Sequence, residues 1–371
     1  MKYMEVVYLI THAKQTGPVN QALNILMGLN RVDGAHAILL TLEKEINGNS
    51  WLQRFRDNNI DTVQFNLPKW NVWGCVSKLK KYIKDHHINV VHSSGYKADW
   101  VNMMVRKHVV TVSTQRCLPT EVAEKLPKVI RPILEVHHLS IIKKIDKVVA
   151  CSKALQKVFV EQYGMNISAV QNAVNTEFFT PVGEDKKMEL RKQLSLPVDK
   201  TTYLVLGSLR KRKNVGLIID AFKEIENDII QLLIVGTGPD YEALTKQASD
   251  DCRIIFTGAT SKPKDYLQAS DYLVSSALAE GLPNTVLEAL SCGLIPILSD
   301  IEPHKELVEG TSVKHIFERH SKEDLTTMLK ESLSWNVAEQ SKAARQVAVE
   351  SFGIDSLASK YQEIYKTAEK Q

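Results

Sequence analysis

The segment 271–300 restricts the possible folds of this chain more than any other part of its sequence. It reads DYLVSSALAEGLPNTVLEALSCGLIPILSD, with an apolar run over 272–277 near its start and a second over 295–299 near its end. Between the two runs, a Gly-Leu-Pro-Asn turn opens a short amphipathic segment. Two apolar runs of strand length around one helical segment, all within about 30 residues, predict a compact βαβ unit of a parallel sheet.

The turn of this unit has the features of a ligand site. Pro283 suits a first helical turn, and Gly281 lets the backbone approach a ligand closely. Backbone amides at such a helix start favour an anionic group such as phosphate. Glu280 and Glu288 would repel phosphate, but their carboxylates can accept hydrogen bonds from hydroxyl groups beside it. Phosphate together with hydroxyls predicts a nucleotide sugar as the ligand.

Strand-like runs alternate with helical segments along the rest of the chain. In the first half the runs cover 5–10, 36–42, 61–66, 88–93, 109–114 and 147–151. This alternation indicates an α/β protein with doubly wound parallel sheets, in which ligands bind beyond the carboxyl ends of the strands. A length of 371 residues predicts two domains, which we place at 1–178 and 179–350.

The stretch EGLPNTVLEAL, with Glu280 and Glu288 in the βαβ unit, resembles the signature of the retaining nucleotide-sugar glycosyltransferases of family four. The resemblance implies a GT-B fold, with two Rossmann-like domains facing each other across a cleft and a last helix, 351–371, crossing back to the first domain. It also implies that Glu280 contacts hydroxyls of the donor sugar and that Glu288 holds the ribose. The backbone that meets the diphosphate would be that of Gly281, Leu282, Pro283 and Asn284.

A cluster of cations, RKRK, follows the strand that ends at Gly207. Four cations between a strand end and a helix start are suited to a diphosphate leaving group. Lys213 matches the lysine of the family by its spacing from Gly207, whereas Ser208 replaces the usual arginine. The resemblance therefore implies that Lys213 and Arg212 stabilise the leaving group. Two further glycines at the next strand end would cradle the base and ribose, namely Gly236 and Gly238.

The first domain departs from the family pattern at several positions. Gly17 stands alone in the loop after the first strand, where the resemblance implies a backbone approach to the donor diphosphate. A lone glycine is not a dinucleotide fingerprint, which disfavours a nicotinamide oxidoreductase. Ser113 occupies the place of a histidine that many family members have beside the donor sugar. His92 and Arg116 follow as candidates for the acceptor side, with a buried structural role as the alternative for His92.

The charge of the chain differs between its halves. Residues 1–175 hold 23 Lys and Arg against 13 Asp and Glu, whereas residues 176–371 hold 24 against 30. A basic first half favours an anionic partner, and we expect a lipid-linked saccharide or a lipopolysaccharide intermediate at the inner face of a bacterial membrane. The basic amphipathic stretch 121–147 and Trp70 with Trp73 are candidates for peripheral membrane contact. Ordinary packing of these segments on the sheet is the alternative.

Several classes of protein are excluded by what the sequence lacks. Five cysteines without a C-x-x-C pair argue against a disulfide framework and structural zinc. This cysteine usage favours a reducing cytoplasm. The longest apolar runs have strand length, so we expect no membrane span. Because no D-x-D motif stands at a strand end, we expect no metal requirement, and no other cofactor or nucleic-acid partner is expected.

The expected reaction is transfer of a hexosyl or N-acetylhexosaminyl group, with retention, from a nucleotide-diphosphate sugar to a saccharide acceptor. A UDP-sugar is the expected donor. Two alternatives stay open from the residues. A nucleotide-sugar epimerase can use the same architecture, and a non-catalytic nucleotide-binding protein would account for Ser113 in place of the histidine.

Overall fold

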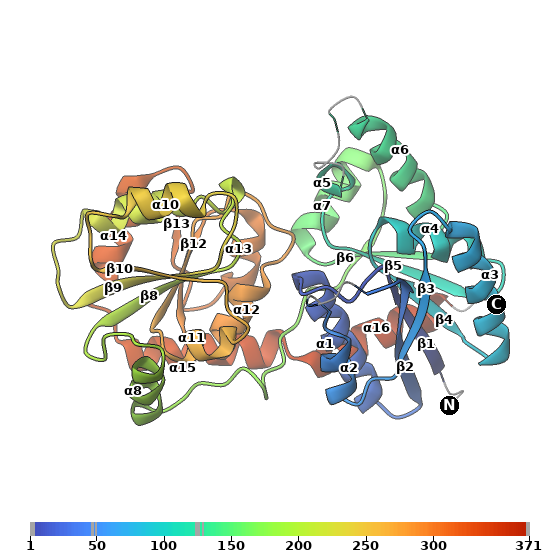
Figure 1. Cartoon of the computed structure of the whole chain (residues 1–371), viewed down its shortest axis with the longest axis horizontal. Helices are drawn as coiled ribbons and strands as arrows, with labels where there is room; N and C mark the ends of the chain where they lie inside the picture. Colours follow the sequence, from blue (N-terminus) through green and yellow to red (C-terminus); the bar gives the residue numbers. More distant parts are fainter. Residues whose placement is uncertain (1–3, 46–47, 49, 123–126, 128–129, 369–371) are drawn as a thin grey trace. The chain divides into compact units, whose positions relative to one another are not determined.

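The computed structural model describes the chain except residues 1–3, 46–47, 49, 123–126, 128–129 and 369–371. The chain divides into two compact units (Figure 1). Unit 1 contains the chain up to Ala173 and resumes at Ile354, and unit 2 is Val174–Gly353. The sequence predicts these boundaries near 178 and 350.

Unit 1 is built on a parallel sheet with the strand order β3-β2-β1-β4-β5-β6-β7. Its strands are β1 (Met4–Ile10), β2 (Ala35–Glu43), β3 (Thr62–Leu67), β4 (Val90–Ser93), β5 (Val110–Gln115), β6 (Lys147–Ala150) and β7 (Ser168–Ala169). Its helices are α1 (Gly17–Arg31), α2 (Leu52–Asp57), α3 (Val72–Asp85), α4 (Tyr96–Val105), α5 (Pro119–Val122), α6 (Arg131–Ile142), α7 (Lys153–Tyr163) and α16 (Ile354–Ala368).

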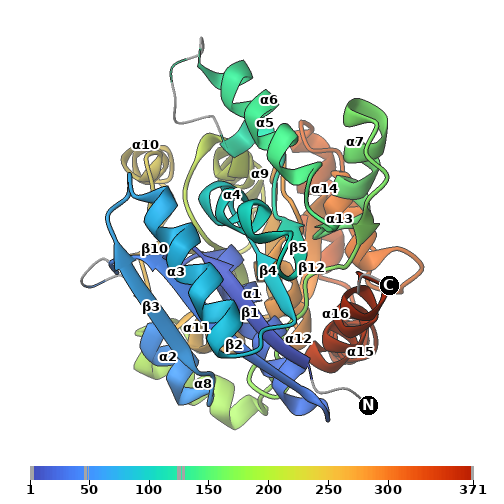
Figure 2. The same cartoon turned by 90° about the vertical axis from the view of Figure 1, so that its right-hand side faces the viewer.

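Helices cover both faces of this sheet, which explains why β1 is apolar at every position except Glu5. Val6 and Tyr8 pack in the core beneath α1 and α16, whereas Val7 and Leu9 pack beneath α3 and α4. Alternate side chains of a strand point to opposite faces, so a strand buried on both sides needs apolar residues at nearly every position. Figure 2 shows α3 and α4 side by side over the sheet.

A glycine lets the last helix pack tightly against the first. A Cβ atom at Gly28 of α1 would lie 2.6 Å from the carbonyl oxygen of Ile354 and 2.9 Å from the Cβ atom of Ala358. Only a residue without a side chain allows this approach. The close packing places Tyr361 and Tyr365 of α16 against the sheet, where both are fully buried.

Unit 2 has a parallel sheet with the strand order β10-β9-β8-β11-β12-β13. Its strands are β8 (Thr201–Leu206), β9 (Ile230–Val235), β10 (Ile254–Gly258), β11 (Tyr272–Ser275), β12 (Ile295–Ser299) and β13 (Ile316–Phe317). Its helices are α8 (Glu184–Gln193), η1 (Lys211–Lys213, a 3₁₀ turn), α9 (Val215–Lys223), α10 (Tyr241–Gln247), α11 (Pro263–Gln268), α12 (Asn284–Ser291), α13 (Glu302–Val308), α14 (Lys322–Ser332) and α15 (Val337–Ser351).

The two doubly wound parallel sheets confirm the predicted fold class. One boundary differs for a clear reason: the apolar run 272–277 was expected to be strand throughout, but β11 ends at Ser275. The next residue, Ser276, turns its hydroxyl to the carbonyl oxygens of Lys213 and Asn214, at 3.0 and 2.8 Å. Part of the segment 121–147 lies outside the described residues; the described remainder includes the end of α5, all of α6 and the first residue of β6. None of the described helices combines the length and apolarity that a membrane span requires.

Candidate active site

Three predicted residues of unit 2 meet where β8 and β11 end. The side chain of Glu280, in the loop after β11, is only 10% exposed. It forms an ion pair with Lys213, and its Oε2 atom accepts a hydrogen bond from Nη1 of Arg212 at 3.1 Å. The same Nη1 atom also donates to the carbonyl oxygen of Ala279 at 3.0 Å. The acidic loop and the basic turn therefore form one charged cluster.

Glu280 is ionised in this cluster. Burial raises the pKa of its carboxyl, but the charges of Lys213 and Arg212 and their hydrogen bonds lower it by more, so the pKa lies below its ordinary value. A charged carboxylate with one oxygen on each cation is a strong hydrogen-bond acceptor. Its single negative charge offsets one of the two positive charges, so the cluster keeps a net charge of about +1.

The backbone holds the two loops together independently of the charges. Besides the two bonds from the Ser276 hydroxyl, the amide of Leu278 donates to the carbonyl oxygen of Arg212 at 2.8 Å. Asn214, which ends the basic turn, has a positive φ of 51°, a conformation that Asn adopts more readily than most residues. The position of both cations is thus set by the end of β11.

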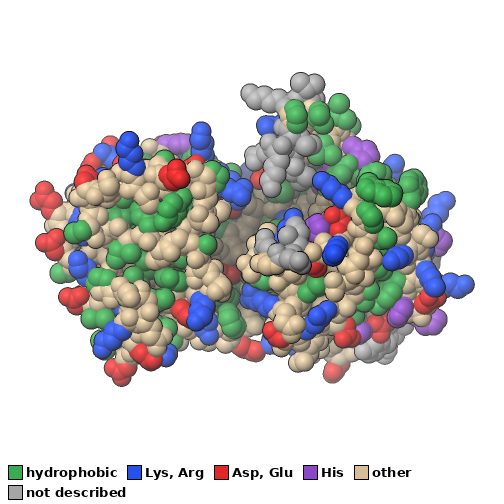
Figure 3. Space-filling view, viewed as in Figure 1, with side chains coloured by type: hydrophobic (Ala, Val, Ile, Leu, Met, Phe, Trp, Pro, Cys, Tyr) green, Lys and Arg blue, Asp and Glu red, His purple; other side chains and the backbone are tan. Residues whose placement is uncertain are grey.

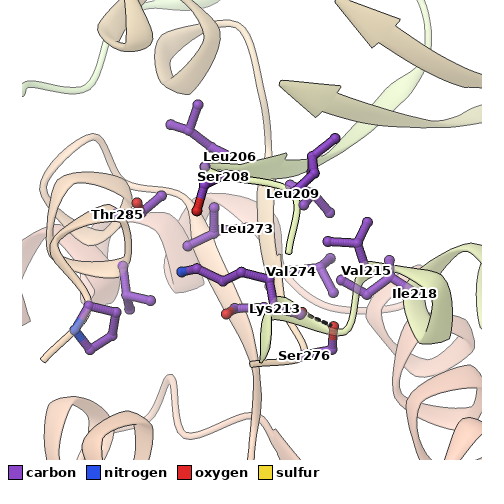
Figure 4. A pocket seen from close by; sticks show the side chains of 15 residues that line it. Leu206, Ser208, Leu209, Lys213, Val215, Ile218, Leu273, Val274, Ser276 and Thr285 are labelled. Atoms are coloured by element: carbon purple, nitrogen blue, oxygen red, sulfur yellow. Dashed lines mark hydrogen bonds between the residues drawn. The ribbon is translucent and has the colours of Figure 1, made fainter. Parts of the chain in front are cut away.

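Lys213 lies in a pocket at the carboxyl ends of β8 and β11. Figure 4 shows its side chain across the middle of the pocket, with Ser208 and Thr285 on one side and Val215 with Ile218 on the other. The pocket is also lined by Gly207 and Pro283. An apolar wall with a few convergent polar groups is typical of small-ligand sites.

The predicted glycines at these strand ends have a packing function. Gly207 and Gly236 have φ values of +144° and +147°, which favour glycine. A Cβ atom at Gly236 would lie 1.8 Å from the carbonyl oxygen of Gly207, and one at Gly238 would lie 2.1 Å from that of Leu209. Close contact between the loops after β8 and β9 therefore requires glycine at 236 and 238, independently of any ligand.

The remaining predicted donor residues lie at the start of α12. Leu282 and Pro283 are buried, whereas Gly281 and Asn284 are half-buried. Asn284 and Glu288 are one helical turn apart on α12 and so share a face. Glu288 is half-buried, and its charge adds to burial in raising the pKa of Cys292 to about 12.

One residue beneath the site escaped the sequence analysis. His304 of α13 is fully buried, with its Nδ1 atom 3.0 Å from the carbonyl oxygen of Ser299 and its Nε2 atom 3.4 Å from the hydroxyl of Ser275. Burial lowers its pKa to about 4, although the charge of Glu280 acts in the opposite direction. A neutral histidine thus joins the ends of β11 and β12. Its position shortly after an apolar strand is the feature of the sequence that could have identified it as a site residue.

In unit 1, His92 is not placed to contact a ligand. Its side chain is fully buried, and both ring nitrogens are occupied: Nδ1 by the hydroxyl of Tyr365 and Nε2 by that of Thr114, each at 2.7 Å. The expected acceptor role is therefore corrected to a structural one, because α16 covers the residue. Gly17, by contrast, is exposed at the first turn of α1.

Ser113 belongs to a buried polar network on the other face of the sheet. Its hydroxyl and that of Ser93 both donate to Oδ1 of Asp99, at 2.7 Å each. The Oδ2 atom of Asp99 accepts from Gln115 at 3.1 Å and lies 3.0 Å from Nε2 of His138. The residue at the position of the family histidine thus joins β5 to α4 and has no exposed surface.

Arg116 lies directly after β5 and is half-buried. Its Nη1 atom donates to Oδ1 of Asn172 at 2.5 Å and its Nη2 atom to the hydroxyl of Tyr8 at 3.3 Å. Among the described residues, no group of three His, Cys, Asp or Glu side chains is arranged to hold a metal ion.

Two family models match the chain in succession. Residues 25–178 match "Glycosyltransferase Family 4", and residues 186–348 match "Glycosyl transferases group 1". The second match contains the whole Glu280–Lys213–Arg212 cluster, and the first contains His92 and Arg116.

Similar proteins and structures agree with these matches. An uncharacterized glycosyltransferase, MJ1069 of Methanocaldococcus jannaschii, is 33% identical over 45% of this chain and 44% of its own length. The Escherichia coli UDP-Gal:alpha-D-GlcNAc-diphosphoundecaprenol alpha-1,3-galactosyltransferase is 29% identical over 54% of each chain. The chain thus spans about half the length of these curated relatives. Anabaena Alr3699/HepE, solved with UDP and glucose, has the same fold, with a TM-score of 0.82 at 16% identity over 98% of this chain and 100% of its own.

Proposed function

Because this chain belongs to the glycosyltransferases that the family 4 and group 1 models describe, we propose that it transfers a sugar from a nucleotide-diphosphate donor to a saccharide acceptor, with retention at the anomeric carbon. The observation that carries the proposal is the cluster of Glu280 with Lys213 and Arg212. A hydroxyl-binding carboxylate next to two diphosphate-binding cations matches the two chemical parts of a nucleotide sugar.

In the proposed complex, unit 2 binds the donor. Lys213 and Arg212 bind the diphosphate, and Glu280, released from them, accepts hydrogen bonds from hydroxyls of the sugar. Glu288 holds the ribose, and the backbone from Gly281 to Asn284 approaches the diphosphate. Two observations support this arrangement: the pocket around Lys213 and the HepE complex with UDP and glucose, which makes a UDP-sugar the first donor to test.

The proposed chemistry is a front-face displacement. The bond between the anomeric carbon and the diphosphate oxygen breaks, and the electron pair leaves with the diphosphate. The acceptor oxygen bonds to the same face of that carbon, and its proton passes to the departing phosphate. A covalent glycosyl-enzyme would need an additional carboxylate as nucleophile, whereas Glu280 is committed to the cations and the sugar hydroxyls.

The proposed function of the two cations is electrostatic. They stabilise negative charge that develops on the leaving diphosphate, and removing one such contact raises a barrier by about 2.7–4 kcal/mol. With these cations in place, we propose that no metal ion is needed. Loss of activity in the presence of a chelator would contradict that part of the proposal.

The proposed acceptor is a lipid-linked saccharide bound by unit 1, with peripheral contact to a membrane surface. Trp70 and Trp73 are 81% and 71% exposed at the start of α3, and Ile133 and Val136 of α6 are 68% and 67% exposed. Figure 3 shows hydrophobic side chains next to Lys and Arg on this part of unit 1. Exposed aromatic residues among cations are typical of proteins that lie on anionic lipid.

The proposal is tested by release of nucleotide diphosphate. The purified chain is incubated with a panel of nucleotide sugars and with crude bacterial lipid-linked oligosaccharide, with Glu280→Ala and Lys213→Ala as controls. We expect release from one donor that depends on the acceptor and is lost in both variants. A free isomer of the donor would identify an epimerase, and tight binding without release would identify a nucleotide-binding protein.

A further inference from the structure

We propose that Arg116 anchors a second anion site, in unit 1, which takes a phosphate or diphosphate group. The assignment of this group to the acceptor rests on the proposed function. The existence of the anion site rests on Arg116 and its surroundings. The site can therefore exist even if the proposed function is wrong.

The first observation is that the charge of Arg116 has no counterion in the part of the chain that the structure describes. Its guanidinium donates to the Asn172 amide oxygen and the Tyr8 hydroxyl, both of them neutral groups. Its Nε atom is buried and has no hydrogen-bond partner among the described residues. A guanidinium presents five donors in a planar fork, so Arg116 retains unused donor capacity.

The second observation is that the surrounding side chains do not balance this charge. Tyr8 and Tyr361 are buried phenols, and burial raises the pKa of Tyr361. Burial lowers the pKa of His92 well below its ordinary value, and the charge of Arg116 lowers it further. Tyr361 and His92 are therefore uncharged near pH 7 and do not offset the charge of Arg116.

Other buried or half-buried arginines in the described part of the chain have the hydrogen-bond partners that Arg116 lacks. Arg191 pairs with Asp271 at 2.7 Å, and Arg253 pairs with Asp251 at 2.6 Å. Arg345 lacks a carboxylate partner within the described ranges, but it donates to three backbone carbonyl oxygens, those of Phe179, Ser291 and Thr176 at 2.7–2.8 Å. Each of these guanidinium groups is satisfied within the fold, whereas Arg116 is not.

The third observation is the position of Arg116 in the sheet. The amide of Cys151 donates to the carbonyl oxygen of Gln115, so the residues after β5 and β6 lie side by side. Ser152 follows and caps α7 by accepting a hydrogen bond from the amide of Leu155 at 3.0 Å. Arg116 thus lies at the carboxyl edge of a doubly wound sheet, the edge where such folds bind ligands. The amide end of α7 adds positive potential there.

These observations favour a phosphate or diphosphate as the occupant. A guanidinium matches the geometry of phosphate oxygens with two parallel hydrogen bonds. The half of the chain that contains Arg116 has an excess of cations, 23 against 13 acidic residues over 1–175. The E. coli relative acts on a diphosphoundecaprenol-linked sugar, which shows one natural form that such a group takes. The free anion and the lipid-linked one share this chemistry.

The site is tested with inorganic diphosphate as the probe, in a Lys213→Ala background that weakens the cation pair of unit 2. Calorimetric titration at constant ionic strength compares this background with the addition of Arg116→Met, Arg116→Lys or Arg106→Met. We expect Arg116→Met to weaken diphosphate binding by about tenfold or more, because hydrogen bonds to a charged group are lost. Arg116→Lys should retain part of the affinity, and Arg106→Met, which removes another half-buried arginine of unit 1, should retain all of it.

Equal diphosphate affinity with and without Arg116→Met would overturn the proposal. Should Arg116→Met fail to fold, the unmodified chain provides the test: phenylglyoxal labelling is followed by peptide mass spectrometry, and diphosphate should slow the labelling of Arg116. Labelling at an unchanged rate would overturn it as well.

Two further probes distinguish the sources of the group. A short-chain prenyl diphosphate that binds more tightly than inorganic diphosphate would support a lipid-linked acceptor, and equal affinities would support an anion site without lipid selectivity. If Arg116→Met instead abolished binding to phosphatidylglycerol vesicles while diphosphate bound to neither form, Arg116 would belong to a membrane surface and the proposal would fail. Donor turnover is not needed for any of these measurements.

Discussion

At the scale of single residues, Glu280 has two incompatible partners. In the structure it pairs with Lys213 and Arg212, yet in the proposed complex the diphosphate takes both cations and Glu280 turns to the sugar. A nucleotide diphosphate without its sugar would leave this 10% exposed carboxylate with no replacement donors. The proposed complex thus has Glu280 compete with the product for the cations, and we expect this competition to favour release.

We expect Glu280→Gln to bind the free nucleotide diphosphate more tightly while it loses transfer. The neutral amide no longer competes for the cations, and a gain of about fivefold corresponds to about 1 kcal/mol. Calorimetric titration of both proteins measures the affinity. Glu224→Gln removes an exposed carboxylate that pairs with Lys322 and should leave the affinity unchanged. Weaker product binding by Glu280→Gln would contradict the competition.

His304 makes the stability of unit 2 depend on pH. Its folded-state pKa of about 4 lies below the ordinary value of 6.5, so between these values the unfolded chain binds more protons than the folded chain. The free energy of unfolding should therefore fall as the pH drops from 6.5 to 4, by about 3 kcal/mol for this group. Urea unfolding at several pH values measures the effect. His304→Gln should show a shallower dependence, and an unchanged slope would exclude His304 as a source.

At the scale of elements, the loops after β8 and β9 pack against each other through glycines. Gly236→Ala would place a Cβ atom 1.8 Å from a backbone oxygen at a φ of +147°, so the loops must move apart. We expect a loss of about 2 kcal/mol or more in the free energy of unfolding, together with weaker donor binding.

Gly183→Ala is the matched control for this change. Gly183 has a φ of −70°, and a Cβ atom added there would have no described atom within 4 Å, so its substitution should be nearly neutral. Chemical denaturation measures both variants. Equal stability of Gly236→Ala and Gly183→Ala would show that the loops adapt without cost.

The end of β5 shows how adjacent residues of one strand acquire different functions. Ser113 points to Asp99 beneath α4, Thr114 bonds to His92 and Tyr361 beneath α16, and Arg116 follows past the end of the strand. The alternation of a strand puts neighbours on opposite faces. Ser113 therefore cannot replace the family histidine without leaving its hydrogen bond to Asp99.

At the scale of the whole molecule, the exposed apolar residues of unit 1 predict binding to anionic vesicles. Trp70→Ala with Trp73→Ala should reduce co-sedimentation with phosphatidylglycerol vesicles, because exposed indole rings contribute binding at the lipid interface. High salt should weaken the residual binding, which we expect to arise from the excess of Lys and Arg over residues 1–175. The affinity for a nucleotide sugar should stay the same. Unchanged co-sedimentation of the double variant would remove α3 from the proposed membrane surface.

The sequence determined most of the secondary structure and the unit 2 cluster. Strands buried on both faces need continuous apolar runs, so β1, β9 and β12 are visible in the sequence. Glu280 lies in the loop after β11, and Arg212 and Lys213 lie in the loop after β8; parallel strands bring their carboxyl ends to one edge. Local patterns were sufficient in these cases, because residues that follow parallel strands in the sequence lie at the same edge of the sheet.

Only the tertiary structure decided which of these residues are available to a ligand. His92 is covered by Tyr361 and Tyr365, about 270 positions later in the chain. The sequence around His92 does not predict that contact. Whether a charge has a counterion is likewise a property of the folded neighbourhood. The sequence places Glu280, Lys213 and Arg212 after strands but does not show that they pair, and it does not show the neutral surroundings of Arg116. Burial and charge pairing depend on contacts between distant parts of the chain, which is why the sequence alone names the candidates and the fold selects among them.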